Sequence, residues 1–158
     1  MEQEGLFQQQ EETTSARNAV EANFDKYLLF MSDNLLFGAK AENVVEIITN
    51  HSITHLPLVP HYILGIINLR GQIIPIIDVR ILLGRCSPSE NGCIIILNID
   101  RTIIGIYVDT VQKMVDIDRR IILPATAQGT QDLVSGMCSL EDGQTMMVLD
   151  CAKILSQP

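Results

Sequence analysis

Three aspartates follow apolar stretches of the chain and are candidates for acid or base chemistry: Asp78, Asp109 and Asp150. Carboxylates held at strand ends can transfer protons in catalysis. Each of these aspartates also stands where a helix or turn is expected to begin, and an Asp side chain there can accept a hydrogen bond from the backbone. We therefore predict capping roles for all three. Asp78 is expected to begin a short helix over residues 79–83 that ends before Gly84.

The serines and cysteines show no catalytic context. The sequence contains neither a nucleophile elbow nor a Gly-rich phosphate-binding loop. Four cysteines are present, without CxxC or other metal-ligand spacing: Cys86, Cys93, Cys138 and Cys151. For a protein made in a reducing compartment, buried free thiols are favoured over disulfides. These features favour a protein that is not an enzyme and binds no cofactor.

Three histidines lie close together in the sequence and raise the question of a metal site: His51, His55 and His61. Their spacings of four and six residues, inside a proline-containing segment, do not place them on one face. No acidic or thiol ligand stands beside them. A solvated loop is therefore favoured, and no metal is predicted.

Composition argues against several classes of partner. The 158 residues suit one compact unit, or two small ones that share a core. A formal charge of −8, with no basic cluster larger than Arg119-Arg120, disfavours nucleic acid. Every apolar run is much shorter than the roughly 20 residues of a membrane span. The first residues lack the pattern of a signal peptide, so we expect a cytoplasmic protein without direct membrane insertion.

Short apolar segments separated by turns predict an all-β fold. The expected strands are residues 27–31, 35–39, 46–48, 66–69, 72–77, 93–99, 102–108, 114–116, 136–140 and 145–149. Within residues 41–48, however, Val44, Ile47 and Ile48 recur at helical spacing. Residues 1–24 are acidic and rich in Gln, which predicts a flexible N-terminal tail before a folded domain over residues 25–158.

The segment 60–84 carries the most specific local signals. Two β-branched runs flank a polar turn, which predicts a hairpin. The turn consists of Asn68, Leu69, Arg70 and Gly71. Gly71 can supply the positive φ that the turn needs. Pro75 cannot donate to a ladder, so its strand is expected to be an edge or to carry a bulge.

An internal repeat relates two halves of the chain, about residues 27–85 and 93–155. At offsets of 67 to 72 residues, the matches include Gly38 with Gly105, Val44 with Val111, Gly65 with Gly136, and Asp78 with Asp150. Gly, Pro and Asp mark backbone geometry, so their shared order indicates two similar β modules. Modules of this size are marginal alone, and we expect them to pack together with a groove at the junction.

Apolar residues near the repeated glycines have two interpretations. Val44 and Ile47 in the first half, and Val111 and Met114 in the second, could all belong to the core. The missing side chains at Gly105 and its counterpart could instead open space for an apolar helix. Both interpretations stay open from the residues alone.

The chain resembles the CheW family of chemotaxis coupling proteins over residues 27 to about 155. The likeness rests on Tyr27-Leu28-Leu29-Phe30, Val44-Val45-Glu46-Ile47, Leu56-Pro57, Tyr62-Ile63-Leu64-Gly65, Asn68-Leu69-Arg70-Gly71, Pro75-Ile76-Ile77-Asp78-Val79-Arg80 and Gly105-Ile106-Tyr107-Val108-Asp109. The Gly-x-x-Asn-Leu-Arg-Gly run followed by Pro-x-x-Asp-x-Arg is the most specific of these.

This resemblance implies a fold of two intertwined five-stranded SH3-like β-barrel subdomains with short helices. It implies a non-enzymatic adaptor that couples chemoreceptors to the histidine kinase CheA. The implied partners are the cytoplasmic tip of the receptors, bound in the groove between subdomains, and the regulatory domain of CheA. The protein is then expected to join receptor arrays at the membrane.

Carried onto this sequence, the resemblance implies receptor-groove positions at Val44, Glu46, Ile47, Arg70, Cys93, Gly105, Val111 and Met114. Asn68, Leu69, Gly71 and Asp78 are expected to hold the neighbouring structure. Glu46 and Arg70 look like an acid and base pair, which either contacts the receptor or only orients the turn. A scaffold of the same fold in another chemosensory or surface-motility pathway, and a thiol-based sensor using Cys86 or Cys93, are the alternatives.

Overall fold

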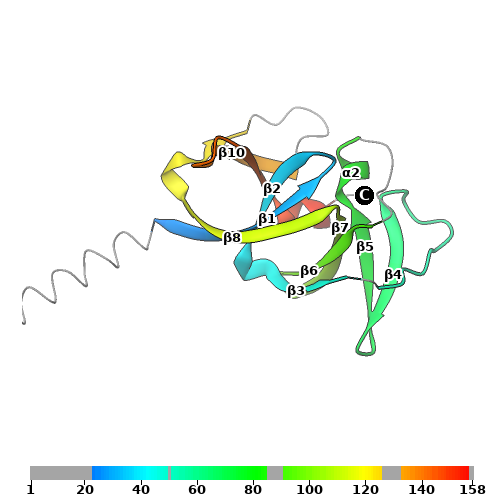
Figure 1. Cartoon of the computed structure of the whole chain (residues 1–158). Coiled ribbons are helices and arrows are strands. Elements are labelled where there is room, and N and C mark those ends of the chain that lie inside the picture. The colour runs from blue at the N-terminus through cyan, green and yellow to red at the C-terminus, as the bar shows by residue number, and fades with distance from the viewer. Residues whose placement is uncertain (1–22, 50, 85–90, 126–132, 157–158) are drawn as a thin grey trace, which may run out of the picture.

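The computed structural model describes residues 23–49, 51–84, 91–125 and 133–156. This part of the chain contains eleven strands and four short helices (Figure 1). The strands are β1 (Phe24–Ser32), β2 (Leu35–Lys40), β3 (Val44–Ile48), β4 (Ile63–Leu69), β5 (Gln72–Asp78), β6 (Cys93–Ile99), β7 (Thr102–Val108), β8 (Thr110–Asp118), β9 (Leu123–Pro124), β10 (Val134–Ser139) and β11 (Thr145–Leu149). The helices are η1 (Ala41–Asn43), α2 (Val79–Leu82), η2 (Arg119–Ile121) and α3 (Cys151–Leu155). The all-β prediction with short helices is confirmed. Most of the predicted tail, residues 1–22, lies outside the described residues.

The strands form two sheets that share both halves of the sequence. We call the six-stranded sheet, in the order β8-β1-β2-β11-β10-β9, sheet A, and the five-stranded sheet, in the order β3-β6-β7-β5-β4, sheet B. The first hairpin of the first half, β1–β2, therefore lies in sheet A with strands of the second half. The first hairpin of the second half, β6–β7, lies in sheet B with strands of the first half. Apart from the two-residue β9, both sheets have the same order of repeat-equivalent strands. The repeat is thus realised as an exchange of hairpins.

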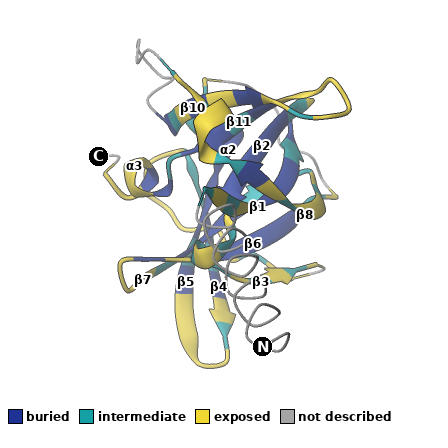
Figure 2. Cartoon of the chain, turned by 90° about the vertical axis from the view of Figure 1, so that its left-hand side faces the viewer, coloured by how far each residue is buried: buried dark blue, intermediate teal, exposed yellow. Residues whose placement is uncertain are grey.

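Three apolar clusters hold the sheets together. A central cluster contains residues of both sheets, including Leu28, Phe30, Ile95 and Leu97, and lies between them. Sheet A has a second cluster around Leu29, Met146 and Val148, and sheet B a third around Ile67, Ile74 and Ile96. Figure 2 shows buried residues along the strands of both sheets and an exposed end on the β4–β5 hairpin.

The helical spacing predicted within residues 41–48 is wrong beyond Asn43. Only η1 is helical, and β3 starts at Val44. The pairing of β3 with β6 shifts in register between Val44 and Glu46. A bulge inserts one residue and changes which side chains share a face. Val44 and Ile47 therefore lie opposite Leu97 and Ile95 of the central cluster, on one face of the strand. In this way a bulged strand reproduces the i, i+3 spacing that is typical of a helix.

The same device appears in the repeat-equivalent strand. In β8, Val111 opposes Phe30 and Met114 opposes Leu28, with a register shift between the two pairs. Phe30 and Leu28 belong to the central cluster. Val111 and Met114 therefore face the central cluster, as their counterparts in β3 do.

The predicted hairpin at residues 60–84 is confirmed as β4 and β5. Arg70 and Gly71 have φ values of 53° and 85°, and two consecutive positive φ angles are typical of a type I′ turn. Asn68 Oδ1 accepts a hydrogen bond from the Gly71 N–H at 3.0 Å. The prediction that this strand is an edge or carries a bulge is wrong. β5 lies between β4 and β7, and the extra residue at the register shift of the β4–β5 pairing belongs to β4, between Ile63 and Gly65. The pairing of β5 with β7 begins only after Pro75, so the proline lies outside that ladder.

Candidate functional site

Two edge strands, one from each sheet, form the walls of the candidate site. β3 is an edge of sheet B and β8 an edge of sheet A, and both lie toward the viewer in Figure 1. Val44 and Val111 are partly buried against the central cluster. Ile47 and Met114 are 42% and 47% exposed. The structure therefore places these four predicted residues at the junction of the two sheets, two at its base and two open to solvent.

A cavity of about 670 Å³ adjoins this junction. It is lined by Ile48 at the end of β3, by Thr110 and Val111 at the start of β8, and by Cys93 at the start of β6. Further lining residues are Thr49, His51, Ile53, His55, Leu64, Asn91, Gly92, Ile94, Tyr107 and Asp109. The lining is mostly apolar, as expected for a surface that receives apolar groups of a partner.

Cys93 is a buried wall residue whose thiol is poorly placed for reaction. It is 8% exposed. Burial raises the pKa of its thiol, the Asp109 carboxylate adds to this, and a hydrogen bond with the Val111 backbone opposes it. Burial likewise raises the pKa of the Cys138 thiol. Reactive thiols are instead exposed and have a lowered pKa, so neither cysteine supports a thiol sensor. Cys86 lies outside the described residues.

Of the two interpretations left open for Gly105, the structure supports core packing and not an open space beside the glycine. A Cβ atom built on it would lie 2.5 Å from Ile76 Cδ1 and 3.0 Å from Ile94 Cγ2. At Gly38 the corresponding space is filled by the Met146 side chain. Both glycines therefore make room for neighbouring core side chains. Gly105 supports the site through packing within sheet B.

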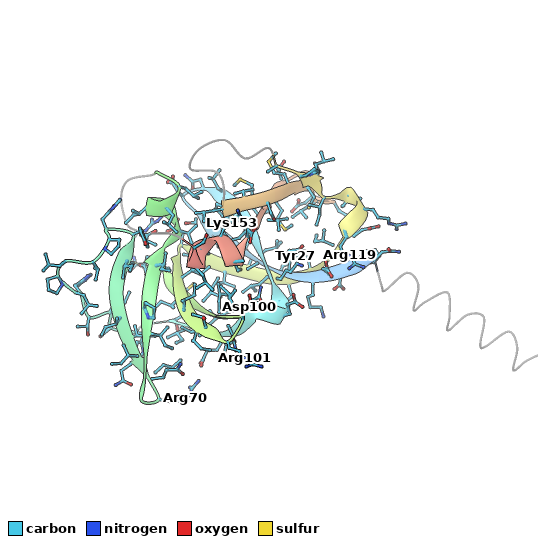
Figure 3. The ribbon with its side chains drawn as sticks, turned by 180° about the vertical axis from the view of Figure 1, so that it is seen from behind. Tyr27, Arg70, Asp100, Arg101, Arg119 and Lys153 are labelled. Carbon is cyan, nitrogen blue, oxygen red and sulfur yellow. The ribbon has the colours of Figure 1, made fainter. Side chains whose placement is uncertain are left out.

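Glu46 and Arg70 form the predicted ion pair. The Arg70 guanidinium donates a hydrogen bond to Glu46 Oε1, which connects the β4–β5 hairpin with β3. The Arg70 side chain is 73% exposed and that of Glu46 30%. Figure 3 shows Arg70 at the outer end of its hairpin. An exposed pair of this kind stabilises a fold by about 0–1 kcal/mol, so the guanidinium keeps most of its capacity to meet a partner.

Asp78 caps α2, as predicted, and takes part in a buried ion pair that we did not predict. Its carboxylate accepts a hydrogen bond from the Arg80 backbone N–H at 2.9 Å. The same carboxylate accepts two from the guanidinium, from Nε to Oδ1 and from Nη2 to Oδ2, each at 3.2 Å. Asp78 is fully buried and Arg80 is 4% exposed. The Asp-x-Arg spacing at the start of a short helix is the sequence signal for this pair.

Asp109 has a different role from the capping that we predicted. It is the single residue between β7 of sheet B and β8 of sheet A. Its carboxylate accepts hydrogen bonds from the Asp33 N–H at 2.7 Å and from Arg80 Nη1 at 3.1 Å. Asp150 precedes α3 as predicted, but its side chain makes no capping hydrogen bond.

The histidines do not converge. Within the described residues, no group of three or more His, Cys, Asp or Glu side chains could hold a metal ion. His55 Nδ1 lies 2.8 Å from the Leu64 carbonyl oxygen, and His51 joins it in lining the cavity. In the same part of the chain, no helix is both long and apolar enough to cross a bilayer.

Residues 26–158 match the CheW-like domain family. The chain belongs to this family. A chemotaxis protein CheW from Klebsiella aerogenes is 32% identical over 149 residues, which cover 90% of this chain and 89% of the relative. A chemotaxis protein CheW from Helicobacter pylori is 25% identical over 158 residues, covering 96% of this chain and 94% of the relative.

A solved structure with the CheW-like fold supports the same assignment. The crystal structure of the scaffolding protein TtCheW from Thermoanaerobacter tengcongensis matches with a TM-score of 0.73 and 32% identity. The match covers 80% of this chain and 88% of that one. The predicted family is therefore confirmed, together with its β-rich architecture.

Proposed function

We propose that this CheW-like protein is a non-enzymatic adaptor that couples chemoreceptors to the histidine kinase CheA in chemotaxis signalling. The observation that carries the proposal is the pair of repeat-equivalent edge strands, whose apolar side chains face a common junction beside an exposed guanidinium. The protein is proposed to act in the cytoplasm, where it is recruited to receptor arrays at the membrane.

The receptor is proposed to bind through a helix of its cytoplasmic tip. An amphipathic helix presents apolar side chains at spacings of three and four residues and lays them into an apolar groove. Ile47 and Met114 are exposed on opposite walls and are suited to contact such side chains, while Val44 and Val111 form the base. Arg70 at the neighbouring hairpin would meet a carboxylate or carbonyl group of the receptor.

The kinase is proposed to dock elsewhere, through the regulatory domain of CheA. Strand ends and loops away from the β3–β8 junction are the surfaces left for it when the receptor is bound. An adaptor that holds both partners in fixed geometry couples them, because a state favoured in one partner changes the free energy of the other. No chemical step is needed.

The proposal is tested by measuring the affinity of a receptor-tip fragment for three variants, Ile47→Asp, Met114→Asp and Arg70→Ala. These variants keep the partly buried Val44 intact, whereas Val44→Asp would place a charge against the core. We expect each aspartate variant to weaken binding of a receptor-tip fragment by about tenfold or more, since a carboxylate replaces an apolar contact. Arg70→Ala is expected to weaken it by about three- to tenfold, with little change in stability.

Two variants serve as matched controls. Arg101→Ala removes an arginine from another hairpin turn, where φ is also positive at 72°. Leu123→Asp places a charge at a residue that is 68% exposed on β9, at the far edge of sheet A. Both should bind the receptor fragment like the wild type. Folded groove variants with unchanged receptor binding and unchanged kinase control in reconstituted arrays would refute the proposed site.

A further inference from the structure

The β7–β8 crossover is the shortest connection between the two sheets next to the groove. β7 ends at Val108 in sheet B, and β8 starts at Thr110 in sheet A. Asp109 alone makes the change of sheet. Val111 and Met114, which line one groove wall, follow within five residues. The backbone conformation at Asp109 therefore sets the position of strand β8 relative to strand β3, and with it the width of the groove between them.

Asp109 is held from three directions. Its N–H donates to the Met31 carbonyl oxygen at 3.0 Å. Its Oδ2 accepts from the Asp33 N–H in the β1–β2 turn at 2.7 Å, and its Oδ1 accepts from Arg80 Nη1 at 3.1 Å. Met31 and Asp33 belong to the hairpin of sheet A, whereas Arg80 follows β5 of sheet B. The bend is thus tied to both sheets.

Arg80 is well placed to fix this bend because it is itself held on the other side. Its guanidinium makes a two-point contact with the buried Asp78 carboxylate, and it lies 5.9 Å from the ring centroid of Tyr107. Burial alone would lower the pKa of Arg80, but its hydrogen bond with Asp78 and the charges of Asp78 and Asp109 outweigh this and raise it. The guanidinium therefore stays charged and rigidly oriented.

We propose that Arg80 and Asp109 are positioning residues of the groove, which hold the first half of β8 at the separation from β3 that a receptor helix requires. Neither residue needs to touch the receptor. The receptor part of this inference rests on the proposed adaptor function, whereas its structural part does not.

Asp109→Asn is the informative variant. It removes the charge that faces Arg80 while Asp78 continues to pair the guanidinium, so the fold should survive. Arg80→Met would leave the Asp78 carboxylate buried without its partner and is expected to threaten folding itself. Asp116→Asn is the matched control, because it removes the same charge from an exposed position of the same strand.

Amide hydrogen exchange in the full chain, with and without a receptor-tip fragment, tests the proposal. In Asp109→Asn, exchange over residues 110–114 should accelerate by about fivefold or more while strand β10 is unchanged. Affinity for the receptor fragment should fall about tenfold while binding of the CheA regulatory domain is retained. Asp116→Asn should match the wild type in all three measurements.

The exchange and binding measurements can fail independently. Unchanged exchange over residues 110–114 in a folded Asp109→Asn variant would overturn the positioning role. So would faster exchange there with full receptor affinity. If the wild type itself fails to bind any receptor fragment, the proposed adaptor function fails, and the exchange measurement still decides whether Asp109 holds β8.

Discussion

Asp78 and Asp150 occupy matching positions in the two halves of the molecule but differ in what surrounds them. Their backbones are nearly the same, with φ and ψ of −90° and 108° at Asp78 and −87° and 96° at Asp150. Each N–H donates to a carbonyl at the repeat-equivalent position, Tyr62 at 2.8 Å and Leu133 at 2.7 Å. Two residues later, however, one half has Arg80 and the other has Ala152.

This difference shows which features the repeat preserves. Gly, Pro and Asp keep the backbone path in both halves, while the buried contact between this aspartate and an arginine two residues later is made in the first half. In the first half, Arg80 connects α2 to Asp109 at the crossover beside the groove. At the other crossover Glu42 stands in the place of Asp109, and no arginine follows Asp150. The Arg80–Asp109 ion pair therefore fixes the crossover that lies next to the proposed receptor site.

The largest expected effect comes from breaking the buried pair in one half only. Asp78→Ala leaves the Arg80 guanidinium buried without its main partner and should lower the free energy of unfolding by about 3–5 kcal/mol. Asp150→Ala, at a half-buried position without an arginine, should cost about 1 kcal/mol or less. Urea unfolding of both variants measures the difference. Equal losses would mean that the two positions are energetically alike despite their different partners.

A second comparison uses the repeat-equivalent glycines Gly65 and Gly136, each of which lies close to the backbone of another segment of the chain. A Cβ on Gly65 would overlap the Thr54 carbonyl oxygen, and Gly65 has a φ of 156°. A Cβ on Gly136 would lie 2.9 Å from the Leu123 carbonyl oxygen and 2.7 Å from Ile122 Cγ2. Because the Cβ would lie 2.1 Å from a backbone oxygen at Gly65 but 2.9 Å from one at Gly136, Gly65→Ala should destabilise by about 3 kcal/mol and Gly136→Ala by about 1 kcal/mol. Thermal unfolding of the two variants checks this order, and a larger loss for Gly136→Ala would contradict it.

A smaller effect of pH on stability should come from Cys151 in the second half. Burial, with a contribution from the Asp150 charge, raises the pKa of Cys151 from 9.0 to about 11, although the hydrogen bond with Asn43 opposes it. The folded state therefore holds the thiol proton more tightly than the unfolded chain does. Stability from this group is fully present below pH 9 and is lost as pH rises toward 11, by about 2 kcal/mol.

The repeat supplies a natural control for this effect. The residue that matches Cys151 in the first half is Val79, which is fully buried. Cys151→Val should therefore remove the part of the alkaline loss that comes from Cys151, without introducing a new titratable group. Unfolding free energies of both proteins at pH 8.5 and pH 10.5 provide the measurement. If the variant loses as much stability as the wild type, the alkaline response arises elsewhere.

Local signals made much of the fold predictable. The type I′ turn at Arg70-Gly71, the cap at Asp78 and the repeat all depend on residues whose backbone preferences act over a few positions. The bulges in β3 and β8 were not predictable in this way, because they depend on pairing with strands distant in sequence. Their i, i+3 spacing therefore resembled a helix.

The residues of the candidate site were likewise predictable only in part. Ile47 and Met114 were expected near a groove, and the structure places them on opposite walls of one junction. The two interpretations of Gly105 could not be separated, because sequence alone does not say which side chain fills the space beside a glycine. Arg80 was missed as a site residue, since a charged residue in a four-residue helix is usually exposed. Only the exchange of hairpins between sheets brings it to Asp109.

The central claim is that a receptor helix binds between β3 and β8, and amide chemical shifts measured during a titration test it most directly. A labelled full-length protein is titrated with a receptor-tip fragment, and shift changes are mapped onto the strands. The largest changes should fall on residues 44–48 and 110–114 and on the turn at Arg70. Saturable binding that shifts other surfaces and leaves both edge strands unchanged would contradict the claim.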